Sequence, residues 1–205
     1  MSARPAIPAE IVEAGALAIL RGLDPDAAVR AAEAIHAGGI AAVEVTLDSP
    51  GALDAISALA RDSQPVGAGT VLDVSAAQAA IDAGADFLVT PECQPSLISW
   101  AAERGIPIFP GALTPSEIRQ AWGAGAAAVK LFPAVGLAFE YVRALAAPLG
   151  GIPLIPTGGV TGSNAQAWRD AGAVAVAVGG WLTASEDPAI LTQRAAAVRV
   201  RAERF

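Results

Sequence analysis

A single lysine, Lys130, is the residue of this chain with the clearest capacity for chemistry. The other twelve of its 13 lysines and arginines are arginines, and Lys130 stands within an apolar run, residues 126–133. Burial disfavours the charged form of an amine, and a neutral primary amine attacks carbonyl groups to form imines. A coding bias toward arginine explains the composition, but not why the exception occurs where arginine is hardest to bury. The pattern favours Lys130 as a nucleophile over an incidental residue.

Glu44 is the second candidate, because it lies in a short apolar segment between two valines. Side chains alternate along a strand, so the valines are expected to face outward and Glu44 inward. The same alternation directs Lys130 inward, between Val129 and Leu131. An acid and a base thus project into one interior, as expected of a functional site. The alternative is a buried ion pair that only holds the fold together, but such pairs are weak stabilisers.

Further polar residues and glycines end the predicted strands. Arg21 follows the first strand and can hold a carboxylate or phosphate there, although a solvated arginine would have the same pattern. Thr70 and Thr90 end the third and fourth strands, where ordinary turn chemistry is the alternative, and at least an equal one for Thr90. Glycine pairs follow the last two strands, where parallel barrels often bind phosphate through backbone N–H groups. These pairs are Gly158-Gly159 and Gly179-Gly180.

Short apolar segments alternate with helix-like segments along the chain, which is the pattern of a parallel α/β fold. The predicted strands are residues 16–20, 41–46, 65–70, 86–90, 107–110, 127–132, 152–157 and 174–178. The predicted helices are residues 25–37, 51–60, 75–83, 95–104, 115–122, 139–147, 165–170 and 188–204. No Gly-x-Gly-x-x-Gly motif follows the first strand, which argues against a doubly wound sheet. We predict a single-domain (β/α)8 TIM barrel over residues 1–205, with a short N-terminal helix.

The composition narrows the class of protein further. Hydrophobic residues make up 54% of the chain and charged residues 16%, which indicates extensive burial and room for an oligomer interface. A net charge of −7 argues against nucleic acid as a partner, and no apolar stretch approaches the roughly 20 residues that span a bilayer. The N-terminus lacks a secretory signal pattern, and a single cysteine fits a reducing compartment. We expect a soluble cytoplasmic protein without a metal or other cofactor.

Five segments together resemble the KDPG/KHG aldolases, in order and with that family's spacing, from about Ala16 to Leu182. They are residues 43–47 (Val-Glu-Val-Thr-Leu), 67–71 (Gly-Ala-Gly-Thr-Val), 110–118 (Pro-Gly, then Thr-Pro-Ser-Glu-Ile), 129–134 (Val-Lys-Leu-Phe-Pro-Ala) and 156–160 (Pro-Thr-Gly-Gly-Val). The Lys-Leu-Phe-Pro-Ala and Thr-Pro-Ser-Glu segments are the specific ones. The family comprises class I aldolases that act on 2-keto-3-deoxy-6-phosphogluconate (KDPG), its galactonate isomer, or 4-hydroxy-2-oxoglutarate (KHG).

The resemblance implies reversible cleavage of such a small 2-keto acid to pyruvate and an aldehyde, either glyceraldehyde 3-phosphate or glyoxylate. It implies that Lys130 is the Schiff-base lysine and that Glu44 is the general acid and base. The implied pocket residues are Arg21, Thr70, Pro91, Phe132 and Thr157, and the implied phosphate-binding residues are Gly158, Gly159, Gly179 and Gly180. Members of the family are typically homotrimers without a metal.

Two positions depart from the family pattern. Asp48 stands where many KDPG-specific members carry arginine, and the stretch Leu-Asp-Ser-Pro is more similar to the 6-phosphogalactonate-type relatives. Trp181 stands where many members have a phosphate-contacting serine, and its bulk could narrow the pocket toward a smaller or unphosphorylated substrate. The substrate's stereochemistry and phosphorylation therefore stay open. Two other functions are alternatives: a phosphosugar isomerase or decarboxylase on the same barrel, and a catalytically inactive trimeric binding shell.

Overall fold

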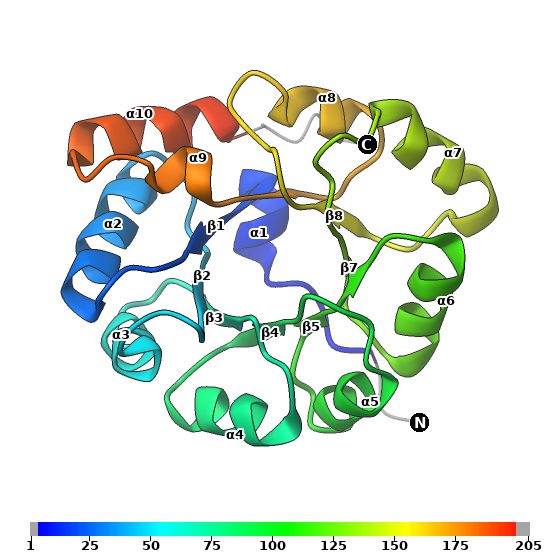
Figure 1. The fold of residues 1–205 in the computed structure, drawn as a ribbon, viewed down its shortest axis with the longest axis horizontal. Helices are drawn as coiled ribbons and strands as arrows, with labels where there is room; N and C mark the ends of the chain where they lie inside the picture. Colours follow the sequence, from blue (N-terminus) through cyan, green and yellow to red (C-terminus); the bar gives the residue numbers. More distant parts are fainter. Residues whose placement is uncertain (1–3, 200–205) are drawn as a thin grey trace.

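The computed structural model describes residues 4–199, whose strands form a parallel barrel. The strands are β1 (Ala16–Leu20), β2 (Val43–Thr46), β3 (Val66–Gly69), β4 (Phe87–Val89), β5 (Ile108–Phe109), β6 (Gly111–Ala112), β7 (Val129–Leu131), β8 (Leu154–Pro156) and β9 (Val176–Val178). One sheet has the order β5-β4-β3-β2-β1-β9 and the other has the order β6-β7-β8. A parallel bridge between Thr157 and Ala177 joins β8 to β9. Figure 1 looks down the resulting ring of strands, and the predicted (β/α)8 barrel is confirmed.

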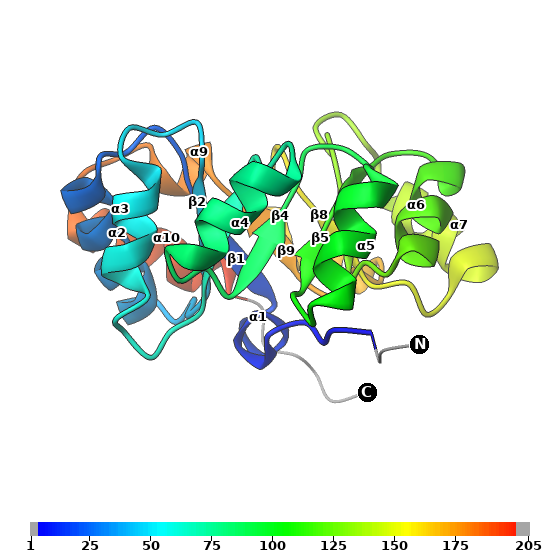
Figure 2. The ribbon, with the colours of Figure 1, turned by 90° about the horizontal axis from the view of Figure 1, so that it is seen from below.

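Helices surround the strands on the outside of the ring (Figure 1). They are α2 (Pro25–Ala37), α3 (Ala52–Leu59), α4 (Val74–Asp82), α5 (Pro95–Glu103), α6 (Pro115–Ala124), α7 (Phe139–Leu149), α8 (Ala165–Asp170), α9 (Gly180–Thr183) and α10 (Pro188–Val198). A further helix, α1 (Ala9–Ala14), lies at one end of the barrel instead (Figure 2). Several begin at a side-chain cap followed by proline, as at Asp24 before α2 and Thr114 before α6. No described helix has both the length and the apolar character that a bilayer crossing requires.

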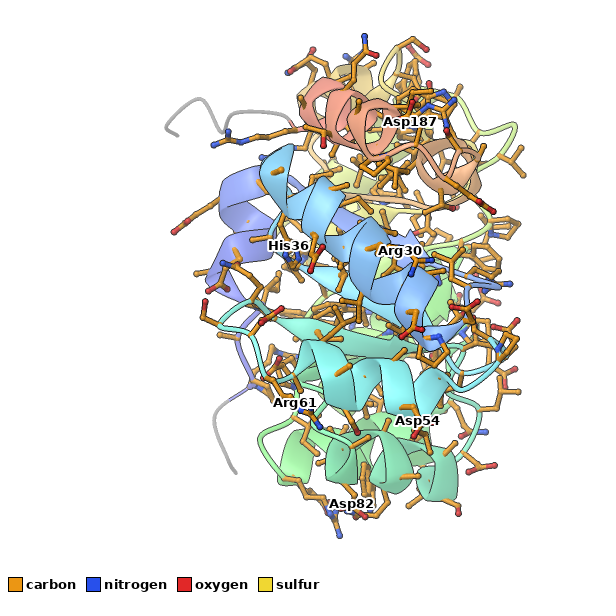
Figure 3. All side chains as sticks on the ribbon, turned by 90° about the vertical axis from the view of Figure 1, so that its left-hand side faces the viewer. Arg30, His36, Asp54, Arg61, Asp82 and Asp187 are labelled. Carbon is orange, nitrogen blue, oxygen red and sulfur yellow. The ribbon has the colours of Figure 1, made fainter. Side chains whose placement is uncertain are left out.

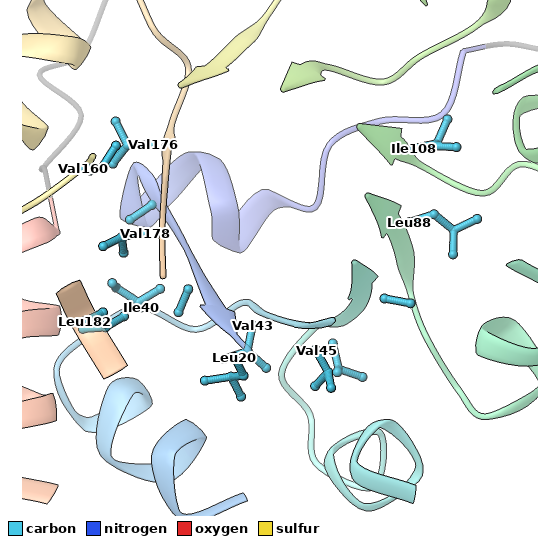
Figure 4. Close-up of a cluster of buried hydrophobic side chains, with 14 of the residues drawn as sticks. Leu20, Ile40, Val43, Val45, Leu88, Ile108, Val160, Val176, Val178 and Leu182 are labelled. Atoms are coloured by element: carbon cyan, nitrogen blue, oxygen red, sulfur yellow. The ribbon is translucent and has the colours of Figure 1, made fainter. Parts of the chain in front are cut away.

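The larger hydrophobic cluster fills the layer between strands and helices. Val43 and Val45 of β2 pack there with Ala28 of α2 and Ile56 of α3, and Figure 4 shows part of this cluster. Figure 3 shows the outer surface of the same helices, which carries their charged side chains, including those of Arg30 and Asp54. The valines of β2 therefore face outward, and the side chain between them faces the barrel interior.

A smaller hydrophobic cluster fills the inside of the barrel. Ile11 of α1 packs there against Leu17, Phe87, Phe109 and Ile155, which come from four different strands. Figure 2 shows α1 at one end of the barrel. Because α1 leads directly into β1, that end is the one where the strands begin. The opposite end, where the strands lead into the helices, is where barrel enzymes place their active sites.

Several predicted boundaries were wrong, and the strands predicted to begin at residues 127, 152 and 174 each begin two residues later. The fifth strand is interrupted at Pro110, which separates β5 from β6 because proline has no N–H to donate to the ladder. The second strand begins at Val43 rather than at residue 41. The last helix ends at Val198, because Arg199 leaves the helical region with φ −57° and ψ 111°. The predicted continuation over residues 200–204 lies outside the described residues.

Candidate active site

Lys130 lies at the centre of β7 with its side chain directed into the barrel. Its backbone N–H donates a 2.9 Å hydrogen bond to the carbonyl of Pro110, so β6 and β7 together fix the start of the side chain. The residue is 6% exposed, and Nζ lies 5.1 Å from the centre of the Phe132 ring. Phe132 itself is 36% exposed. The amine is thus buried among mostly apolar side chains, next to an aromatic ring that is partly exposed to solvent.

Glu44 projects into the same interior from β2, on the other side of the ring of strands. It and Lys130 border one small pocket, whose other lining residues are Leu17, Val89, Phe109, Ile155, Thr157 and Ala177. Glu44 is 1% exposed, and neither carboxylate oxygen has a hydrogen-bond partner among the described residues. Burial raises the pKa of the Glu44 carboxyl above its ordinary value, while the positive charges of Lys130 and Arg21 oppose that shift without cancelling it.

Lys130 and Glu44 share the pocket without forming a direct ion pair. The described residues contain two ion pairs within 4.0 Å, Arg21–Asp48 and Arg143–Glu140, and neither involves the buried amine or the buried carboxylate. This arrangement does not fit the alternative that the two groups only stabilise the barrel, because that role requires good mutual geometry and satisfied hydrogen bonds. The amine and the carboxylate therefore border the same pocket without neutralising each other.

Arg21 lies at the end of the barrel where the strands lead into the helices, which is called the mouth from here on. It donates a 3.0 Å hydrogen bond to Oγ1 of Thr70 and lies 3.6 Å from the carboxylate of Asp48, with both charged side chains about half exposed. Thr70 is the one described residue other than glycine with a positive φ, 57°. That backbone conformation is uncommon for a β-branched residue and is found mainly where the surrounding structure imposes it. Three loops therefore meet through one guanidinium group.

A buried hydroxyl pair supports the loop that carries Arg21. Ser49 Oγ accepts a 2.8 Å hydrogen bond from the N–H of Gly22, the next residue along from Arg21. Ser49 Oγ also lies 3.0 Å from Thr46 Oγ1, and both hydroxyl residues are buried. The loop after β1 is therefore tied to the end of β2, within a few residues of Glu44.

The remaining predicted residues divide between the pocket and its surroundings. Thr157 lines the pocket, and its hydroxyl donates to the carbonyl of Ile155. Pro91 does not line it: its carbonyl instead packs against Gly111, where an added Cβ would lie 2.1 Å from that oxygen. Gly158 and Gly159 have φ values of 102° and 71°, which side chains rarely tolerate. Gly179 packs on Ile19 and Gly180 begins α9, so both glycine pairs follow strand ends, as predicted.

Trp181 does not narrow this pocket. A Cβ built on Gly162 would lie 3.1 Å from its indole edge and 2.9 Å from Ala197 of α10, which places the ring against α10. Arg194 of α10 donates a 2.9 Å hydrogen bond to the Trp181 carbonyl and lies 5.5 Å from the centre of its ring. The indole ring of Trp181, which was expected beside the predicted phosphate-binding glycines, therefore packs outward. Within residues 4–199, no cluster of three or more His, Cys, Asp and Glu side chains has the geometry of a metal site.

Comparison with known proteins identifies the family. A family model described as KDPG and KHG aldolase matches residues 7–196. The chain belongs to the KDPG/KHG aldolase family. It is 35% identical over 192 residues to the 2-dehydro-3-deoxy-6-phosphogalactonate aldolase of Escherichia coli strain K12, a match that covers 92% of this chain and 94% of that protein. The chain is therefore an aldolase, a carbon–carbon lyase.

Two solved structures of the aldolase family are similar throughout. The 2-keto-3-deoxy-6-phosphogluconate aldolase of Zymomonas mobilis ZM4, solved with 3-phosphoglycerate, is 28% identical with a TM-score of 0.88, and the match covers 98% of this chain and 99% of that one. The KDPG aldolase of Legionella pneumophila, with pyruvate captured as a covalent carbinolamine, is 26% identical with a TM-score of 0.84, covering 94% and 97%.

Sequence reasoning missed three features of this aldolase site. It did not connect Ser49 and Thr46 to the loop of Arg21, and it did not pair Asp48 with Arg21. It also treated Gly69 only as part of a motif, although the Glu44 side chain lies directly over it. The small residues Gly67, Ala68 and Gly69 within a strand were a signal for the last of these, because glycine in a strand often marks a close approach.

Proposed function

We propose that the protein cleaves a 2-keto-4-hydroxy acid reversibly to pyruvate and an aldehyde, through a Schiff base on Lys130. The observation that carries this proposal is the shared apolar pocket of Lys130 and Glu44, in which the amine and the carboxylate face one space without pairing. The family supports the reaction class. The covalent carbinolamine described for the Legionella relative supports the imine route.

The imine supplies the electron sink for the reaction. The unprotonated amine of Lys130 attacks the C2 ketone to give a carbinolamine. The carbinolamine hydroxyl then takes a proton from solvent and leaves as water, which gives a protonated imine. When the C3–C4 bond breaks, its electron pair moves toward the iminium nitrogen and leaves the pyruvate enamine on Lys130.

Glu44 moves the protons. As a carboxylate it accepts the proton of the C4 hydroxyl, which becomes the aldehyde carbonyl. The resulting carboxylic acid then protonates C3 of the enamine, and hydrolysis of the imine releases pyruvate. General acid–base catalysis of this kind contributes about 10²–10⁴-fold. The raised pKa of Glu44 suits both roles, because the group can hold a proton between the two steps.

The anionic ends of the substrate are assigned to the mouth of the barrel. Arg21 and Thr70 would hold the carboxylate of the keto acid, with Phe132 and Thr157 beside the reacting carbons and Pro91 farther out. A phosphate would lie against Gly158, Gly159, Gly179 and Gly180. The backbone N–H groups of Gly158 and Gly159 donate no hydrogen bond within the described residues, and Gly159 is exposed. KDPG, its galactonate isomer and KHG are the candidate substrates.

Borohydride trapping tests the Schiff base. The protein is reduced in the presence of pyruvate, its intact mass is measured and its peptides are mapped. One adduct on Lys130 is expected, and Lys130→Arg should give none. Arg61→Lys is the matched control, because it adds an exposed lysine just after α3 (Figure 3) that should stay unmodified.

The other outcomes separate the alternative functions. No adduct on a folded protein would overturn the imine and favour the isomerase, the decarboxylase or the inactive shell. An aldolase should also catalyse exchange of the pyruvate methyl hydrogens with solvent, whereas the inactive shell should not. Glu44→Gln should abolish that exchange, and full activity in this variant would remove Glu44 from the mechanism.

We further propose that the protein works as a homotrimer in the cytoplasm. Family membership supports the trimer, as do apolar side chains at the surface, such as Leu72 at 52% and Val135 at 67% exposure. The single cysteine supports a reducing compartment. Light scattering should give three times the chain mass, and a monomer at micromolar concentration would contradict the proposal.

A further inference from the structure

The Glu44 side chain lies directly on the backbone of β3, at Gly69. A Cβ added to Gly69 would lie 1.9 Å from Oε1 of Glu44, 2.6 Å from Cδ and 2.7 Å from Cγ. These three are the nearest atoms to that position, so the space that Gly69 leaves is filled by the carboxylate and by nothing closer. The two strands are in register at this point, with Thr46 opposite Gly69.

Backbone conformation does not explain this glycine. Gly69 lies within β3 and is not among the glycines with positive φ, so alanine is compatible with its backbone. Glycine also weakens a strand, because it has no side chain to pack and loses more freedom on folding. The remaining reason for glycine here is the close approach of the Glu44 carboxylate.

The carboxylate also lacks the usual means of fixing a catalytic group. Neither of its oxygens has a hydrogen-bond partner among the described residues, and the nearby walls of the pocket are mostly apolar. Its position is therefore set by contact with the surrounding surfaces. A partner-free carboxylate is suited to exchanging protons with two different atoms of a substrate, because no protein donor favours its charged form.

We propose that Gly69 is a positioning residue for Glu44: its missing side chain forms the recess that sets the carboxylate at its working distance from Lys130. This inference rests on the proposed function, in which Glu44 transfers protons. An alanine at this position would force the carboxylate to move by about 1.5 Å to reach an ordinary contact distance of 3.4 Å. A displacement of about 1 Å in an active site can lower the rate by roughly 10²-fold.

A stability cycle tests the contact itself. Gly69→Ala should lower Tm by roughly 5 °C or more in the wild-type background, because overpacking a buried site is destabilising. In the Glu44→Ala background the same change should lower Tm little, because the clashing atoms are gone. Gly67→Ala is the matched control from the same strand: its Cβ would lie 2.1 Å from the Phe87 ring, so its effect should be the same in both backgrounds.

Kinetics test the consequence for catalysis. Gly69→Ala should lower kcat for exchange of the pyruvate methyl hydrogens by about 10²-fold and leave KM for pyruvate within a few-fold. Borohydride should still trap pyruvate on Lys130. Glu44→Asp shortens the side chain and should partly relieve the clash. The double variant Glu44→Asp/Gly69→Ala should therefore be more active than the product of the two single effects.

The outcomes are distinguishable from those of the proposed function. Equal loss of Tm from Gly69→Ala with and without Glu44 would overturn the inference, and so would an unchanged kcat in folded Gly69→Ala. If Gly69→Ala does not fold, the Glu44→Ala/Gly69→Ala protein still decides the question, because the inference requires it to fold. Failure of wild-type protein to trap pyruvate would contradict the Schiff base and leave the steric result intact.

Discussion

The two ends of the barrel interior are built from the same strands but in opposite ways. Ala42 precedes Glu44 by two residues and Ala128 precedes Lys130 by two, so each pair faces the same interior from one segment. The alanines belong to the apolar cluster that Ile11 of α1 closes, whereas the charged residues border the pocket at the other end. In each segment, two residues along the chain therefore separate a closely packed alanine from a buried ionisable side chain.

This difference shows which end of the barrel contains the destabilising features. A buried carboxylate without hydrogen bonds is destabilising, and so is a threonine held at positive φ. Both occur toward the mouth, whereas at the other end Ile11 of α1 packs among apolar side chains. The α1 end supplies stability and the mouth supplies chemistry, and each variant below tests one side of that division.

Replacing Lys130 is expected to have the largest effect. Lys130→Met keeps the length and apolar character of the side chain but removes the amine, so pyruvate methyl exchange should fall to the uncatalysed background. Stability should be unchanged or higher, because replacing a buried ionisable group by a well-packed apolar one is often neutral or stabilising. Measured Tm and exchange rates check both parts, and residual exchange above background would show that another group carries the reaction.

Truncating Ile11 should have the opposite effect. Ile11 is completely buried, so Ile11→Ala should lower the free energy of unfolding by about 2–5 kcal/mol. The kcat per folded molecule should stay unchanged, because α1 closes the far end of the barrel. Denaturant unfolding and active-site titration measure the two quantities, and a large drop in kcat would mean that the two ends are coupled.

Glu44→Gln should remove a pH-dependent loss of stability that the wild-type protein has. The folded pKa of Glu44 is raised, so above the unfolded value of about 4.3 the unfolded chain loses a proton that the folded chain retains. Wild-type stability therefore falls as pH rises from that value toward the folded pKa, and glutamine is free of this loss. The variant should match wild type near pH 4 and be more stable than wild type at pH 7. A Tm difference that does not depend on pH would contradict this.

The sequence predicted the strands and the two interior charges because both depend on local periodicity. Glu44 and Lys130 each have apolar neighbours on both sides, and alternation alone directs them inward. The recess at Gly69, the hydroxyl contact of Ser49 with the loop of Arg21 and the outward packing of Trp181 each depend on distances between segments far apart in the chain. Local pattern contains no such distances, so these features required the fold.

Ser49→Ala should give the smallest effect and the sharpest comparison between the two ends. It removes the acceptor of the Gly22 N–H, which loosens the loop of Arg21 and should raise KM for pyruvate several-fold while changing stability by about 0.5–1.5 kcal/mol. Ser57→Ala is the matched control, because Ser57 donates a 3.1 Å hydrogen bond to the carbonyl of Ala83 at the end of α4, away from the mouth. A similar loss of stability with unchanged KM is expected there. Equal KM values in the two variants would show that Arg21 keeps its position without Ser49. The hydrogen bond from Gly22 to Ser49 would then not be needed for pyruvate binding.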